Sequence, residues 1–187
     1  MRSSQPPLGR ELGLALVGYR GSGKSTAGAI VATWKSREFF DLDLEIESRA
    51  GCSISEIFAR EGEAGFRNRE EEVLHELLLN RPGAVVATGG GVVLRESNRR
   101  ALRRFGIVVW LTADPEVLAA RLATDGTTLS MRPSLTGCGT LEEISQVLAS
   151  RLAYYREVAD RVIETGGKTP DEVARLILEA WSPDRAG

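Results

Sequence analysis

The sequence predicts an α/β protein in which a parallel β-sheet is covered by helices on both faces. Short apolar runs, typical of buried parallel strands, alternate along the chain with segments whose apolar residues recur at helical spacing. The first of these runs also leads through a glycine-rich turn directly into a helix, as in a βα unit. A length of 187 residues with 42% hydrophobic content suits one domain with a full core, so residues 1–187 are interpreted as a single domain.

Residues 12–26, which read LGLALVGYRGSGKST, carry the strongest local signal. The run from Leu12 to Val17 predicts a buried strand, and Gly18 to Ser25 matches the pattern G-x-x-x-x-G-K-[ST]. Glycines let backbone N–H groups curl around a phosphate, and the N-terminus of the following helix adds positive potential. The segment is therefore interpreted as a phosphate-binding loop (P-loop) for a nucleoside triphosphate, with Lys24 on the outer phosphates and the Ser25 hydroxyl on Mg²⁺. The residues expected to hold the nucleotide are Gly21, Ser22, Gly23, Lys24, Ser25 and Thr26.

A second strand is predicted at Phe39 and Phe40, ending at Asp41-Leu42-Asp43, after a helix over residues 24–34. Alternate residues of a strand project to the same side, so the two carboxylates are expected to face the same way. Beside a P-loop, one could serve the magnesium site and the other an acceptor hydroxyl. Without the P-loop, solvated acids in a loop would be an equally good interpretation.

Two helices are predicted before the next strand. Ser53 and Glu56 form a capping box for a short helix, and glycines 62 and 65 frame a turn before a longer helix near Phe66. Arg67 lies beside this apolar anchor and is a candidate site residue. The acidic residues of the longer helix and the only histidine are assigned to its solvated face: Glu70, Glu71, Glu72, Glu76 and His75.

The run AVVAT at residues 84–88 predicts a further buried strand, followed directly by Gly89, Gly90 and Gly91. Ligands of open parallel sheets lie at the carboxyl edge of the strands, so this bare backbone is expected to approach a ligand; a flexible turn is the alternative. The next helix, residues 98–105, is assigned a solvated basic face rather than a nucleic-acid patch: Arg99, Arg100, Arg103 and Arg104.

The last third of the chain continues the alternation of strands and helices. The predicted elements are a strand at 107–111, a helix from Asp114 through Arg121, a helix from Thr140 that contains Arg151, a strand at 162–163 and a helix opened by Thr169. Residues 124–139 interrupt the pattern, because they are rich in Thr, Ser and Gly and carry Arg132 before a proline. This segment predicts a mobile lid over a site.

The composition of the chain indicates which partners and which cellular compartment to expect. A net charge of −2 supplies no general field for nucleic acid or an anionic membrane, and no apolar run approaches a membrane span. Neither a signal peptide nor zinc chemistry is predicted, and residues 1–9 are expected to form a disordered tail. Cys52 and Cys138 are the only cysteines and lie far apart, which favours a reduced, cytoplasmic protein without a disulfide framework.

Taken together, these segments resemble shikimate kinase, a family of P-loop kinases, from about Leu14 to Leu178. The order of the matching blocks is far more selective than the P-loop alone. The blocks are GSGKST at 21–26, Asp41-Leu42-Asp43, SISEIF at 53–58 followed by Phe66-Arg67, ATGGG at 87–91 with Asn98-Arg99, RPSL at 132–135 and the helix with Arg151.

The resemblance implies the three-layer α/β/α fold of P-loop NTPases and a specific reaction. ATP would phosphorylate the 3-hydroxyl of shikimate, giving 3-phosphoshikimate and ADP in aromatic amino-acid (chorismate) biosynthesis. It also implies Mg²⁺ held by Ser25 and, through water, by Asp41. The catalytic residues implied are Lys24, Asp43 on the acceptor hydroxyl and Arg132 over the transferring phosphate, while Arg121 lies on the nucleotide side. The residues implied to bind shikimate are Asp43, Arg67, Gly89, Gly90, Gly91, Arg132 and Arg151, the first two in a substrate-binding segment at about 43–70.

The sequence departs from the family pattern near the predicted lid. It has RPSL where RPLL is usual, a longer spacing from Arg121 to Arg132, and no proline in RLAYY at 151–155. One alternative is a P-loop kinase for gluconate or a nucleotide, although no base pocket is evident between Asp43 and Arg69. The other is a catalytically silent relative that binds ligand as a regulator, against which the intact catalytic motif argues. A monomer acting on a small molecule is expected.

Overall fold

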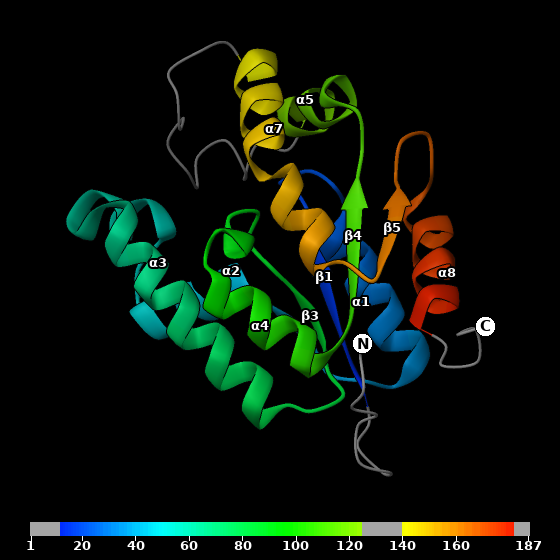
Figure 1. Ribbon diagram of the computed structural model, residues 1–187, viewed down its shortest axis with the longest axis horizontal. Helices are drawn as coiled ribbons and strands as arrows, with labels where there is room; N and C mark the ends of the chain where they lie inside the picture. Colours follow the sequence, from blue (N-terminus) through cyan, green and yellow to red (C-terminus); the bar gives the residue numbers. More distant parts are fainter. Residues whose placement is uncertain (1–11, 125–139, 182–187) are drawn as a thin grey trace.

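The computed structural model describes residues 12–124 and 140–181 (Figure 1). Strands among these residues form one sheet in the order β2-β3-β1-β4-β5, and all the neighbouring strands are parallel. The strands are β1 Gly13–Val17, β2 Phe39–Asp41, β3 Val85–Ala87, β4 Gly106–Thr112 and β5 Arg161–Glu164. The connection after β1 runs to one edge of the sheet and the connection after β3 runs to the other side of β1. Loops after β1 and β3 therefore diverge at the carboxyl edge, where open α/β sheets bind ligands.

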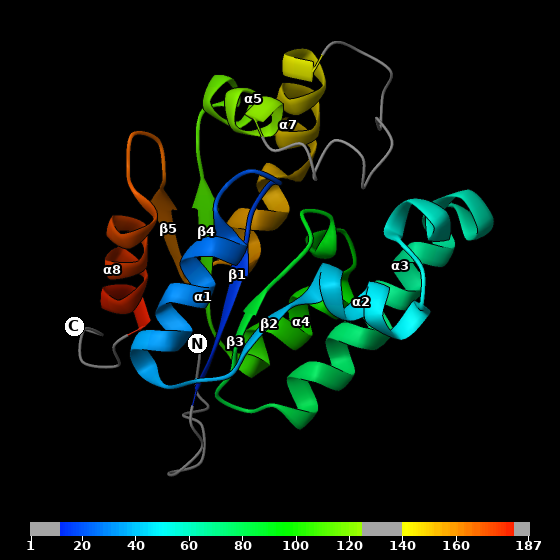
Figure 2. The ribbon, with the colours of Figure 1, turned by 180° about the vertical axis from the view of Figure 1, so that it is seen from behind.

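The alternation of side chains along β1 divides the core between the two faces of the sheet. Leu14 and Leu16 pack with helices α1 (Lys24–Lys35) and α8 (Pro170–Trp181) on one face. Ala15 and Val17 pack on the other face with α3 (Ile54–Asn80), α4 (Glu96–Phe105) and the second half of α7 (Thr140–Val158). Figures 1 and 2 show these helix layers from opposite sides. The predicted α/β/α arrangement is confirmed, and two covered faces explain why the whole of β1 is apolar.

A smaller apolar cluster lies beyond the carboxyl edge of the sheet, where α5 (Pro115–Thr124) and the first half of α7 stand together (Figure 1). Tyr19 of the P-loop joins this cluster and packs with residues of both helices. The remaining members are Ala113, Leu118, Leu122, Ile144 and Val147. The P-loop is thus anchored to helices that stand above the sheet as well as to the sheet itself.

The prediction that both carboxylates of Asp41-Leu42-Asp43 lie on a strand is wrong. The strand ends at Asp41, whose Oδ1 accepts a hydrogen bond from the backbone N–H of Asp43 at 3.0 Å. This is an N-cap, and it starts helix α2 (Leu42–Ala50) at once. Asp43 therefore lies in the first turn of a helix.

The predicted turn between the two helices that follow is confirmed at Gly62 only. Ser53 and Glu56 form the expected capping box at the start of α3, and Gly62 interrupts the helix with φ 69° and ψ −176°. That conformation is in the region that favours glycine. Gly65 is helical, so the second half of α3 begins earlier than expected.

Two charged residues assigned to solvated faces are buried instead. Glu70 is 0% exposed and pairs with Arg67 at 2.9 Å. Arg99 donates to the carbonyl oxygens of Val93 and Leu94 in the 3₁₀ helix η1 (Val92–Leu94) and pairs with Glu157. His75 is half-buried. Helical periodicity predicts that charged residues face solvent. The prediction fails for Glu70, whose partner lies one turn away in the same helix, and for Arg99, whose partners lie in other elements.

Some predictions concern residues whose structure is not described. The tail at residues 1–9 and Arg132 of the predicted lid lie outside the described ranges. Within those ranges, no helix is both long and apolar enough to cross a membrane.

Candidate active site

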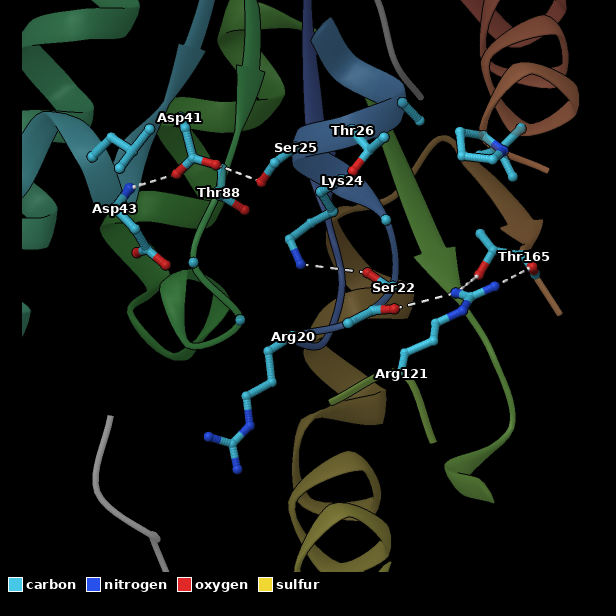
Figure 3. A pocket seen from close by; sticks show the side chains of 18 of the residues that line it. Arg20, Ser22, Lys24, Ser25, Thr26, Asp41, Asp43, Thr88, Arg121 and Thr165 are labelled. Carbon is cyan, nitrogen blue, oxygen red and sulfur yellow. Dashed lines mark hydrogen bonds between the residues drawn. The ribbon is translucent and has the colours of Figure 1, made fainter. Parts of the chain in front are cut away.

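A cavity of about 550 Å³ opens at the carboxyl edge of the sheet (Figure 3). Its walls come from the P-loop with the start of α1, the end of β2 with the start of α2 and α3, the loop after β3, α5, and the loop after β5 with the start of α8. All six residues predicted to hold a nucleotide line it, from Gly21 to Thr26, as do Arg121, Asp41, Asp43, Gly89 and Gly90. The structure therefore brings most of the predicted site residues to one cavity.

The P-loop has the backbone conformation that its glycines permit. Gly21 and Gly23 have φ of 77° and 88°, and a Cβ on Gly18 would lie 2.2 Å from the carbonyl oxygen of Leu111. Gly23 caps α1 without any side-chain hydrogen bond, so the first N–H groups of this helix face the loop. The loop and the helix N-terminus together form an anion-binding cradle.

Lys24 lies across this loop. Its ammonium donates to the carbonyl oxygen of Tyr19 at 2.7 Å and to the Ser22 hydroxyl at 3.4 Å, and the residue is 8% exposed. The contact holds the positive charge at the mouth of the cradle, where a phosphate could replace the carbonyl as its partner.

Ser25 and Asp41 meet beside the loop. The Ser25 hydroxyl donates to Asp41 Oδ2, while Asp41 Oδ1 caps α2. Hydroxyl and carboxylate oxygens are ligands that suit Mg²⁺, which commonly takes one or two protein oxygens and completes its shell with water and phosphate. The donor set therefore fits a magnesium ion shared with a nucleotide.

Asp43 lies close to this pair and also lines the cavity. In Figure 3, Asp43 and Lys24 flank the Ser25–Asp41 contact, and the Asp43 carboxylate points into the cavity. The first turn of α2 holds it there, because the cap at Asp41 fixes the start of the helix. A carboxylate in this place can orient a hydroxyl and accept its proton.

The loop at Gly89 to Gly91 is held by α3 and α7. The carbonyl oxygen of Gly90 accepts hydrogen bonds from Arg151 Nη1 at 3.0 Å and from the Tyr155 hydroxyl at 2.6 Å. A Cβ on Gly91 would lie 2.4 Å from the guanidinium nitrogens of Arg67, so a side chain there would have to displace this guanidinium. Arg67, Gly91 and Arg151 do not line the cavity, but both arginines reach the loop that does.

The environment of these arginines contains residues that the sequence did not single out. Arg67 donates to Glu70 at 2.9 Å and to Glu63 at 3.1 Å, so its fork is neutralised by its own helix. Burial raises the pKa of the Tyr155 phenol to about 12, so the hydroxyl stays a hydrogen-bond donor. In the sequence, only the spacing of Arg67 and Glu70 could have indicated this pair, because residues three apart are neighbours on a helix.

At the opposite end of the cavity, Arg121 was predicted to be a site residue, but the residues beyond it were not. Arg121 joins the P-loop to the loop after β5, because it donates to the carbonyl oxygen of Gly21 at 3.2 Å and to that of Thr165 at 2.7 Å. Thr165, Lys168, Pro170 and Val173 line the cavity beyond it. The signal was available, since this loop follows the carboxyl end of a predicted strand.

Comparison with known proteins agrees with this geometry. The family model described as shikimate kinase matches residues 20–182. A shikimate kinase of Rhodopirellula baltica is 48% identical over 167 residues, which cover 89% of each chain. The solved structure of the shikimate kinase from Acinetobacter baumannii in complex with shikimate is 39% identical, with a TM-score of 0.84 over 90% of this chain and 92% of that one.

A gluconokinase from Sinorhizobium meliloti, the class considered as an alternative, is more distant. It is 18% identical with a TM-score of 0.55, covering 91% of each chain, and so shares the fold alone. The extent and identity of the first set of matches decide the family. This chain belongs to the shikimate kinase family, whose members are ATP-dependent phosphotransferases.

Proposed function

We propose that this protein transfers the γ-phosphate of ATP to the 3-hydroxyl of shikimate. The observation that supports this most directly is the placement of Asp43 and the P-loop in the same cavity. A kinase must hold a nucleophile in line with a nucleotide phosphate, and catalysis then depends mainly on positioning and on positive charge. The related Acinetobacter baumannii enzyme was solved with shikimate bound, which supports the choice of acceptor.

The P-loop side of the cavity would bind the nucleotide. The loop amides and Lys24 would hold the outer phosphates, with the charge of Lys24 released from the Tyr19 carbonyl. Ser25 and Asp41 would hold Mg²⁺, which when bound neutralises charge on the phosphate oxygens. The end of the cavity near Thr165 and Pro170 would receive the base, because it continues from the P-loop past Arg121.

The other side would bind the acceptor. Asp43 would orient the 3-hydroxyl and take its proton while the hydroxyl oxygen forms a bond to the γ-phosphorus. The bond from that phosphorus to the bridging oxygen breaks, and ADP leaves with the electron pair. Arg67 and Arg151 would bind the carboxylate of shikimate, because planar guanidinium groups match it in two hydrogen bonds. The backbone of residues 89–91 would contact the ring.

The proposal extends to features that rest on sequence. Arg132, in the lid predicted at 124–139, would add positive charge over the transferring phosphate. The chain would act as a single domain and a monomer, as the sequence predicts. The two distant cysteines favour the cytoplasm.

An assay of ADP release with separate acceptors tests this function. The panel consists of shikimate, gluconate and nucleoside monophosphates, and ³¹P NMR identifies the position of the new phosphate. We expect turnover with shikimate alone and a product phosphorylated at the 3-hydroxyl. Turnover with gluconate at a rate equal to that with shikimate would overturn the choice of acceptor, and no turnover with any acceptor would support a silent ligand-binding protein.

A further inference from the structure

Arg20 occupies a position of the P-loop at which the motif allows any residue, so the motif assigns it no role. Its side chain nevertheless lines the cavity, and Figure 3 shows it directed away from Lys24 and Ser22. Its guanidinium lies 3.5 Å from Oε1 of Glu143, which belongs to the first part of α7. The P-loop is thus connected by charge to a helix far along the chain.

The Arg20–Glu143 contact is important because Glu143 is buried. Glu143 is 3% exposed, and a carboxylate so far from water is stabilised by nearby cations and hydrogen bonds. The preceding residue of the loop, Tyr19, packs in the same apolar cluster as Ile144 and Val147. Two consecutive P-loop residues therefore hold the first half of α7, one by packing and one by charge.

The same helix carries Arg151, two turns further on, at about 12 Å along the axis. Arg151 donates to the carbonyl oxygen of Gly90, and a Cβ on Gly90 would lie 3.5 Å from the backbone nitrogen of Arg20. The P-loop and the glycine loop are thus in contact, and α7 is fastened to the first at Glu143 and to the second at Arg151. A helix is stiff over two turns, so displacement at one end moves the other.

We propose that Arg20 is a positioning residue for the acceptor, acting through Glu143 to fix α7, and with it Arg151, against the P-loop. This inference rests on the proposed function. In it Arg20 touches neither the reacting hydroxyl nor the transferring phosphate. Its effect is on acceptor binding, because Arg151 is the group proposed to hold the carboxylate of shikimate, and a displacement of about 1 Å in such a group is costly.

A double-mutant cycle tests the proposal. Arg20→Ala, Glu143→Gln and the double variant are compared by kcat and by the KM values for shikimate and ATP. We expect each single change to raise the KM for shikimate about five- to thirty-fold, with the KM for ATP within about two-fold. The double variant should be no worse than the worse single variant, because either single change already breaks the Arg20–Glu143 contact. Arg20→Lys should restore part of the affinity.

Several outcomes would overturn the proposal. Independent, multiplicative effects in the double variant would mean that Arg20 contacts a ligand directly. Equal damage to ATP binding would place it on the nucleotide side, and effects below two-fold would make the contact irrelevant. The matched control is Arg81→Ala, which breaks an exposed pair with Glu38, two residues that precede β3 and β2, and should leave the kinetics unchanged.

Hydrogen exchange supplies a measurement that does not require turnover. In the ligand-free protein, Arg20→Ala should speed amide exchange at residues 141–150 and 89–91 while α8 keeps its wild-type rates. Unchanged exchange at residues 141–150 would contradict the positioning role. If the wild-type protein failed to phosphorylate shikimate, the proposed function would be wrong, yet this measurement would still decide whether Arg20 holds α7.

Discussion

The two halves of the proposed active site are built from different parts of the chain. On the phosphate side, the cradle is a continuous loop from Gly18 to Ser25 whose donors are mainly backbone N–H groups at the start of α1. On the proposed acceptor side, Asp43 comes from α2, Arg67 from α3 and Arg151 from α7. One half therefore depends on the conformation of a single loop, and the other depends on how three helices pack. Substitutions should separate nucleotide binding from acceptor binding accordingly.

The largest effect is expected for Lys24→Ala on the phosphate side. Turnover should be abolished, because the outer phosphates lose the charge that lies across the cradle. The rate of ADP release and the thermal unfolding midpoint (Tm) are the measurements, with Lys35→Ala at the exposed end of α1 as the control. A folded Lys24→Ala protein with wild-type turnover would contradict the proposal that the P-loop binds the phosphates of the nucleotide.

Asp43→Asn should have the next largest effect, on the acceptor side. Asparagine keeps the size of the side chain but cannot accept a proton, so kcat should fall by about two to four orders of magnitude. Binding of ATP, measured by calorimetry, should stay close to that of the wild type. A comparable loss of ATP affinity would show that the two halves are not separate at this residue.

Removal of either acceptor arginine should raise the KM for shikimate about ten- to a hundred-fold, because a charge-assisted pair contributes about 1.5–3 kcal/mol. The KM for ATP should change little. Arg67→Ala also leaves the buried Glu70 without this arginine, so Arg67→Lys and Arg151→Lys are the variants that separate binding from folding. Arg100→Ala, on the exposed face of α4, is the control. An unchanged KM for shikimate in both Arg67→Ala and Arg151→Ala would exclude carboxylate binding at this loop.

The smallest effect is expected for Tyr155→Phe. The carbonyl of Gly90 keeps its bond from Arg151, so loss of one hydrogen bond, about 1 kcal/mol, should reduce kcat/KM for shikimate about five-fold. Burial raises the pKa of this phenol from 10.0 to about 12, so between those values the folded protein keeps a proton that the unfolded chain loses. Stability should therefore fall as pH rises through this window, and less steeply in Tyr155→Phe than in a Tyr154→Phe control. Identical pH profiles would contradict the buried state of Tyr155.

The same division explains what could be predicted from sequence. The P-loop was predictable residue by residue, because a strand, its glycines and a helix N-terminus are contiguous. The glycine loop was predictable as a ligand-facing backbone from its place after a strand. The contacts of Arg67 and Arg151 with this loop were not predicted, because they join segments far apart in the chain; the resemblance implied only that both arginines bind the substrate.

The errors on the acceptor side have local physical causes. An N-cap at Asp41 competes with the continuation of the strand, and alternation alone cannot detect it. Glu70 is buried because Arg67 one turn earlier neutralises it, whereas a periodic pattern places every glutamate in solvent. The Tyr155 hydroxyl reaches a carbonyl on another element, so its sequence position indicates only a core side chain.

The magnesium dependence of Asp41→Asn and Asp43→Asn tests most directly the claim that metal and acceptor are held by different halves. Asparagine is also a good N-cap, so Asp41→Asn should leave α2 in place. With ATP and shikimate saturating, we expect Asp41→Asn to need about ten-fold more Mg²⁺ than the wild type and to recover much of its activity as Mg²⁺ is raised. Asp43→Asn should stay slow at every Mg²⁺ concentration. Rescue of Asp43→Asn by Mg²⁺, with no rescue of Asp41→Asn, would contradict this assignment of the two carboxylates.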